Sequence, residues 1–167
     1  MIVYNPQLKQ EFKDKYVHEA LIFLAGSIEM GVAKNWQSYV IDKLSENTFI
    51  NDSVQVFNPR RDDWDSTWKQ EQTNEEFNYQ VNWEINHLRK ADLILFNFEE
   101  NTKAPITLWE LGRFGRSNNS IVCCPTGFYR YGNIETICTI ENIPLFHSLD
   151  DAIGALSTKI KQITFNK

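Results

Sequence analysis

The first candidate for chemistry is Glu110, a carboxylate in the segment ITLWELGRFG. Thr107 stands three residues earlier, so the pair matches a capping box, in which the glutamate only closes the start of a helix. In the alternative, Glu110 projects into a crevice from the first turn of that helix. There the positive end of the helix dipole would keep it ionised, as a carboxylate nucleophile must be. The local sequence by itself favours the capping box.

A second candidate is Glu84, which lies on an expected helix one turn after Gln80 and beside an apolar stripe. The commoner fate of a helical glutamate is a solvated pairing with a basic neighbour, here Arg89 or Lys90. His87 stands three residues later and is within reach of Glu84, although a single helical histidine is more often structural.

Two further segments have the composition of binding sites. Gly26 and Ser27 follow an apolar run, and small residues there let a ligand approach the backbone, although many such turns contain glycine for geometry alone. The segment NPRRDDWD, residues 58–65, is the densest polar cluster in the chain. It can grip a phosphate, sugar or base, or it can form a salt-bridged loop that packs on itself. Its candidate binding residues are Asn58, Arg60, Arg61, Asp62, Asp63 and Trp64.

The elements that position these residues alternate along the chain. A polar stretch over residues 1–17 is expected to form an irregular arm. Apolar runs predict buried strands, and helical periodicity or start signals predict the segments between them. The expected strands are 20–26, 53–59, 91–98, 120–125 and 143–146, and the expected helices are 32–46, 77–91, 105–116 and 150–163.

This alternation predicts a single α/β domain over residues 1–167. The expected architecture is a three-layer, Rossmann-like or flavodoxin-like fold, with a parallel sheet of about five strands and helices on both faces. Ligands of such sheets bind beyond the carboxyl ends of the strands, where the strand order reverses. Segments 26–28, 58–65 and 97–110 are expected to meet there.

Composition narrows the class of protein. The chain has 167 residues, 42% hydrophobic and 23% charged, which suits one globular domain. A net charge of −5 argues against a nucleic-acid polymer as partner but permits a single nucleotide held by one or two arginines. Three cysteines without zinc or redox spacing fit a reducing compartment. With no signal peptide or membrane-length apolar run, we expect a soluble cytoplasmic protein that needs no metal or cofactor and no membrane.

Four blocks in this order resemble the nucleoside 2-deoxyribosyltransferase-like family: IFLAGSIEMG, NPRRDDWD, NWEINHLRKADLILFNF and TLWELGRFG. The resemblance runs from about Ala20 to Cys124. The family includes transferases that exchange bases on deoxyribose and relatives that hydrolyse nucleotide N-glycosidic bonds. The resemblance implies that Glu110, a glutamate followed by Leu-Gly, is the nucleophile.

The resemblance assigns other positions too. Glu84 stands eight residues before the aspartate that opens the third strand, where the family carries a carboxylate, usually Asp. The turn of Gly26 and Ser27 corresponds to the family's phosphate- or sugar-facing turn. Transferase members carry a Tyr near the nucleophile where this chain has Ile22, and an Asp that helps hold the base where it has Ala104. The base and sugar preference therefore does not carry over.

The implied reaction is N-glycosidic cleavage through a glycosyl-enzyme, with transfer of the sugar to another base. One alternative is a hydrolase of nucleoside 5′-monophosphates, with Ser27 and Arg60 or Arg61 on the phosphate. An alternative of another class is a non-catalytic nucleotide-binding module. The expected partners are a nucleoside or nucleotide, a nucleobase and further copies of this chain, because the resemblance implies a symmetric dimer or larger homo-oligomer.

Overall fold

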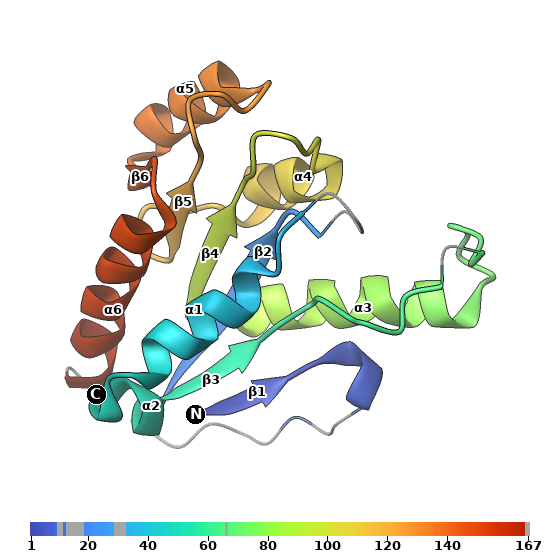
Figure 1. The fold of residues 1–167 in the computed structure, drawn as a ribbon, viewed down its shortest axis with the longest axis horizontal. Coiled ribbons are helices and arrows are strands. Elements are labelled where there is room, and N and C mark those ends of the chain that lie inside the picture. The colour runs from blue at the N-terminus through green and yellow to red at the C-terminus, as the bar shows by residue number, and fades with distance from the viewer. Residues whose placement is uncertain (10–11, 13–18, 29–32, 66, 166–167) are drawn as a thin grey trace.

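The computed structural model describes residues 1–9, 12, 19–28, 33–65 and 67–165. Its centre is a six-stranded sheet in which every neighbouring pair is parallel, in the order β1-β3-β2-β4-β5-β6 (Figure 1). This confirms the predicted α/β class and parallel sheet. The strands are β1 (Ile2–Tyr4), β2 (Ala20–Gly26), β3 (Val54–Phe57), β4 (Leu93–Asn97), β5 (Ser120–Cys123) and β6 (Leu145–Phe146).

Helices cover both faces of the sheet, as the continuous apolar strands predict. They are α1 (Trp36–Ser45), α2 (Thr48–Ser53), α3 (Glu75–Lys90), α4 (Pro105–Phe114), α5 (Tyr131–Glu141) and α6 (Leu149–Phe165), with a short 3-10 helix η1 (Pro6–Leu8). None of the helices in the described part of the chain has the length and apolarity that a bilayer crossing requires.

The strand β2 shows how the two layers are divided. Leu21, Phe23 and Ala25 pack into the cluster that includes residues of α3, α4 and α5. Ile22 and Leu24 pack into the opposite cluster, with α1, α2 and α6. Because successive strand side chains point to opposite faces, one buried strand holds both layers in place.

The structure differs from the sequence-based expectation in three regions. The N-terminal stretch is not wholly irregular, because β1 pairs with β3 and η1 follows it. The helices α2 and α5 have no counterpart in the sequence-based interpretation, which left residues 126–142 without an element. β1 has three residues and α2 has six, which is too short for a period to be recognised, and α5 has little amphipathic contrast because its apolar residues occupy several sides. Of the helix expected over 32–46, α1 begins at Trp36, and residues 29–32 lie outside the described part.

The strand order reverses beside β2, which has β3 on one side and β4 on the other. Beyond the carboxyl ends of β2 and β4, Ser27 N–H donates to the carbonyl of Asn97 at 3.0 Å. The indole N–H of Trp36 donates to the carbonyl of Ser27 at 2.9 Å. A Cβ atom on Gly26 would collide with the Asn97 carbonyl and the Trp36 ring. The close contact of α1 with this turn therefore requires glycine.

Gly26→Ala should lower the free energy of unfolding by roughly 1–3 kcal/mol, because the added methyl group overpacks a site bounded by backbone and a buried ring. Gly154→Ala is the matched control, since nothing lies within 4 Å of a Cβ there and the residue is on α6. In Gly154→Ala, replacing a helical glycine by alanine should raise the free energy of unfolding by about 0.5–1 kcal/mol. Urea unfolding of both variants measures this, and equal effects would contradict the packing explanation.

Candidate active site

The helix that carries Glu110 begins at Pro105, where the helix over 105–116 was expected to begin, and not at the Thr107 of the capping box. Ala104 adopts the left-handed conformation with φ of 43°, and Pro105 is the first helical residue. Proline is favoured there because its fixed φ suits the first turn and it has no N–H to leave unpaired. Thr107 is therefore the third helical residue and Glu110 the sixth. The capping-box interpretation is wrong, and so is the placement of Glu110 in the first turn.

Glu110 lies on the inner side of α4, between Thr107 and Leu111, and only 5% of its surface is exposed. These residues belong to the buried stripe of the helix, and Leu111 packs into the cluster formed with α3. A glutamate in such a stripe is unusual, because a buried charge needs a partner or must be neutralised. Its position is not explained by a structural cap.

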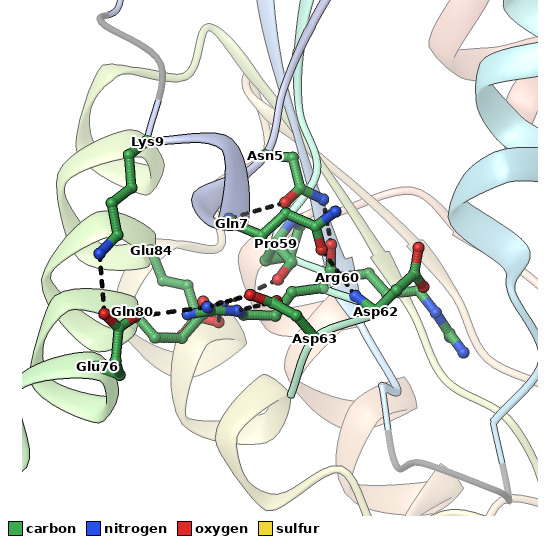
Figure 2. Close-up of polar contacts among 11 residues, drawn as sticks. Asn5, Gln7, Lys9, Pro59, Arg60, Asp62, Asp63, Glu76, Gln80 and Glu84 are labelled. Carbon is green, nitrogen blue, oxygen red and sulfur yellow. Dashed lines mark hydrogen bonds and ion pairs between the residues drawn. The ribbon is translucent and has the colours of Figure 1, made fainter. Parts of the chain in front are cut away.

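Glu84 is partly accessible and lies on α3, which covers the same face of the sheet as α4 (Figure 1). Its Oε1 accepts a hydrogen bond of 2.7 Å from Nε2 of Gln80, one turn earlier. The same Gln80 nitrogen donates to the carbonyl of Pro59 at 3.0 Å (Figure 2). Gln80 therefore connects the Glu84 carboxylate to the loop after β3. No ion pair joins Glu84 to Arg89 or Lys90 within the described residues.

The two carboxylates influence one another. Burial raises the pKa of Glu84 to about 7, and the hydrogen bond from Gln80 opposes this only in part. Burial, and then the nearby charge of Glu84, raise the pKa of Glu110 well above its usual range. The expectation that the helix dipole keeps Glu110 ionised is therefore wrong for the free protein. Glu110 lies too far along the helix for the dipole to outweigh desolvation, because that effect fades beyond the first turn.

Two carboxylates in this state can share a proton. At neutral pH the pair retains one proton more readily than two exposed glutamates would, and the proton belongs to the pair rather than to one residue. Such a pair can provide one carboxylate and one carboxylic acid that act on each other's charge. This is the combination that a nucleophile and a general acid require.

The turn after β2 is closed by hydrogen bonds. Ser27 is fully buried, and its hydroxyl lies 2.6 Å from the hydroxyl of Thr102. Thr102 in turn donates to the carbonyl of Glu99 at 2.9 Å, so Ser27 is the donor in the first bond. The space beside Gly26 is filled by Trp36 and by Asn97. Gly26 and Ser27 therefore connect β2 to α1 and to the loop after β4 in this structure.

The loop after β3 is held by its own charges. Arg61 is 5% exposed and donates two hydrogen bonds to Asp63, Nε to Oδ1 at 2.7 Å and Nη2 to Oδ2 at 2.8 Å. Its guanidinium also lies 3.5 Å from Glu76 and 4.7 Å from the centre of the Trp68 ring. Lys9 pairs with Glu76 at 2.8 Å, so this network extends from η1 to α3 (Figure 2).

The other candidates in this loop have different surroundings. Asn58 accepts the N–H of Arg60 at 3.0 Å through its side chain, forming a local turn. The Arg60 side chain donates to the carbonyl of Lys34 at 3.0 Å, and its Nε is buried without a hydrogen bond. Asp62 is exposed except for its N–H, which donates to Gln7 at 2.8 Å. Trp64 packs edge-on against Trp68, with ring centres 5.2 Å apart.

Sequence reasoning assigned no role to the polar side chains that hold this loop. Asn5 donates to the carbonyl of Arg60, and Gln7 and Gln80 bind backbone groups of Asp62 and Pro59 (Figure 2). Gln80 stands four residues before Glu84, which is the spacing of a helical side-chain pair and was the available signal. Asn5 and Gln7 lie more than fifty residues from their partners, so no local pattern could reveal them.

The sequence comparison placed Ile22 where transferase members of the family carry a Tyr near the nucleophile, and the structure does not support that correspondence. Ile22 packs with α1 and α6, on the opposite face of the sheet from the two carboxylates. The β2 residues on the carboxylate face include Phe23, whose ring lies 6.2 Å from that of Trp83. Because strand side chains alternate, a shift of one residue moves a position to the other layer. Ile22 therefore cannot be the position that approaches Glu110.

The chain is similar to a known protein family. A family model described as nucleoside 2-deoxyribosyltransferase like matches residues 19–128, which is more than half of the chain. The matched region contains both carboxylates, the turn after β2 and the loop after β3. No curated protein matches the chain.

The stability of the fold should depend on pH through Glu84. Its pKa is raised to about 7 from 4.5, so the folded state binds this proton more tightly than the unfolded state. The stabilisation from the bound proton is complete below pH 4.5 and is lost as the pH rises through 7. Glu84→Gln removes this loss, and its amide can still accept from Gln80. The variant should match wild type near pH 4 and exceed it by on the order of 3 kcal/mol above pH 8.

Chemical denaturation across this pH range measures the difference. Glu141→Gln is the control, because Glu141 is exposed at the end of α5 and should show little pH-dependent difference from wild type. A difference for Glu84→Gln that stays constant with pH would show that the Glu84 carboxyl is not desolvated.

Proposed function

The chain belongs to the nucleoside 2-deoxyribosyltransferase-like family, and on this basis we propose that it cleaves the N-glycosidic bond of a nucleoside or nucleotide and transfers the sugar to another base. The observation that carries the proposal is the pair of desolvated carboxylates, Glu84 and Glu110, contributed by neighbouring helices on one face of the sheet. A pair of carboxyl groups is the minimal equipment for glycosidic cleavage with a covalent intermediate.

In the first step, a Glu110 oxygen forms a bond to C1′ as the bond from C1′ to the base nitrogen breaks. The bonding electrons leave with the base, which takes up a proton. In the second step, a nitrogen of the incoming base attacks C1′, loses a proton and releases the Glu110 carboxylate. Two displacements at C1′ retain the configuration of the sugar.

The shared proton of the pair suits this sequence. In the free protein, burial and the charge of Glu84 raise the pKa of Glu110 and so favour retention of a proton by the pair. As C1′ acquires positive charge in the transition state, the carboxylate nearest to it is stabilised and its pKa falls. The proton then passes through Glu84 to the departing base. The network from Gln80 to Pro59 keeps Glu84 in place while this happens.

Glu110→Gln should lower kcat by several orders of magnitude while the fold persists, because an amide cannot form the glycosyl-enzyme. Base exchange is measured with a deoxynucleoside panel and free bases. Mass spectrometry of acid-quenched wild-type protein should show one added sugar on the peptide that contains Glu110. Glu141→Gln, which changes an exposed glutamate on α5, should retain full activity. An active Glu110→Gln protein would remove the nucleophile from the mechanism.

A second candidate function is hydrolysis of a nucleoside 5′-monophosphate, and the surroundings of Arg60 favour it. Arg61 is buried and bound by Asp63 and Glu76, whereas Arg60 is partly exposed and its guanidinium donates to the Lys34 carbonyl through Nη1. Arginine donors of this kind suit a phosphate, which the protein's net charge of −5 would otherwise repel. Sugar release without an acceptor base would indicate this hydrolase. Binding without turnover would indicate a nucleotide-binding module.

Arg60→Ala should raise KM for 5′-monophosphates about tenfold and leave KM for nucleosides nearly unchanged, since a charge-assisted contact contributes roughly 1.5–3 kcal/mol. Arg61→Ala is the contrasting variant. It should weaken both substrate classes and lower the melting temperature, because Arg61 is a buried part of the loop. Equal losses for both substrate classes in Arg60→Ala would leave the phosphate site without support.

A further inference from the structure

A separate cavity of about 540 Å³ opens at the carboxyl ends of β4 and β5, beside the first turns of α1 and α6. Its wall includes Trp36, Tyr39, Asn97 and Phe98, and neither Glu84 nor Glu110 lines it. Trp36 packs in the layer of α1 and α6, whereas the carboxylates belong to α3 and α4 on the other face. The proposed mechanism therefore makes no use of this cavity.

The unusual feature of the cavity is the side chain of Asn97. This residue is 4% exposed, yet its amide makes no hydrogen bond within the described chain, although its carbonyl accepts from Ser27. The nitrogen and oxygen of the amide are not sealed from solvent, so the amide reaches the surface of the cavity that Asn97 lines. A buried amide without partners is costly, and such groups are usually satisfied by water or a ligand. Asn97 therefore presents a free donor and a free acceptor to the cavity.

The other walls favour a flat ligand. Trp36 and Tyr39 provide aromatic surface beside the amide. A cavity of 300–1,000 Å³ with mainly apolar walls and a few convergent polar groups is typical of small-molecule sites. An amide presents its donor and acceptor in one plane, and the best complement is a heterocycle with an acceptor and a donor on one edge.

The charges around the cavity limit the ligand further. Glu99 and Glu100 line it, and Asp150, held by the Tyr39 hydroxyl at 2.7 Å, lies at its edge. The basic side chains of the wall are Lys34 and His147, and the Arg60 guanidinium, which donates to the Lys34 carbonyl and acts on the charge of Glu99, lies beside it. Carboxylates also occupy the first turn of α6, at Asp150 and Asp151, which reduces the attraction of that helix end for an anion. The four carboxylates outnumber the basic groups Lys34, Arg60 and His147, so this cavity favours an uncharged base over a phosphate.

We propose that this cavity is a second binding site, which takes a free nucleobase or unphosphorylated nucleoside with an amino group beside a ring nitrogen, as in adenine, and that the Asn97 amide reads this edge. The site is independent of the glycosidic reaction and would exist even if the chain had no such activity.

The test is calorimetric titration of the full chain with adenine and with purine, which has the same rings but no amino group. Adenine should bind at least tenfold more tightly than purine, because purine leaves the Asn97 acceptor without a donor. Asn97→Ala should weaken adenine binding about tenfold or more. Asn97→Asp keeps the shape but has no donor, and it should do the same. Asn133→Ala, on the exposed side of α5, is the matched control and should bind as wild type does.

Two further measurements separate this site from the carboxylates. Glu110→Gln should bind adenine as wild type does, and in that variant adenosine 5′-monophosphate should bind more weakly than adenosine. The inference is overturned by unchanged adenine binding in both Asn97 variants, by equal binding of adenine and purine, or by no binding at millimolar concentration. Loss of adenine binding in Glu110→Gln would also overturn it, because the base would then lie at the carboxylates, and the proposed reaction would still stand.

Discussion

The desolvation of two neighbouring carboxylates is the constraint on which the rest of the site depends. Glu84 and Glu110 are placed where each favours its protonated form, and the charge of Glu84 adds to the burial of Glu110. In water these side chains would both ionise near pH 4.5 and repel one another. The fold must supply the free energy that keeps them together, and it does so through the packing of α3 and α4 against one face of the sheet.

That packing extends to segments remote in sequence. Gln80 binds both the Glu84 carboxylate and the Pro59 carbonyl, so the second carboxylate and the loop after β3 are positioned by one side chain. The loop is held in turn by Asn5 and Gln7 and by the buried Arg61 guanidinium. An arginine that is bound by a bidentate aspartate and an aromatic ring anchors the loop, because loss of these partners would leave a buried charge unpaired. The two arginines of NPRRDDWD therefore differ. Arg61 anchors the loop, whereas Arg60 is partly exposed and keeps donors for a ligand.

The parallel sheet separates two kinds of surface at its carboxyl edge. On one face lie the carboxylates, and on the other lies a cavity around an unpaired amide. Between them, the hydrogen bonds of Ser27 with Asn97 and Thr102, and the ring of Trp36 against Gly26, close the turn after β2. A turn without space for a side chain keeps the two faces at a fixed separation.

Local sequence determined much of this protein. Apolar runs and helical periods predicted the α/β class, four principal strands and the two helices that carry the carboxylates, because burial of a strand or helix face leaves a regular pattern in the chain. The quoted motifs identified the family that the comparison confirms. The start of α4 at Pro105 agrees with the helix expected over 105–116 and contradicts the capping box, which would begin the helix at Thr107. Only the tertiary structure decided the raised pKa of Glu110, the attachment of Arg61 and the unpaired state of Asn97. Each of these depends on groups brought together from distant parts of the chain, and desolvation and hydrogen-bond pairing are set by that neighbourhood rather than by the identity of the residue.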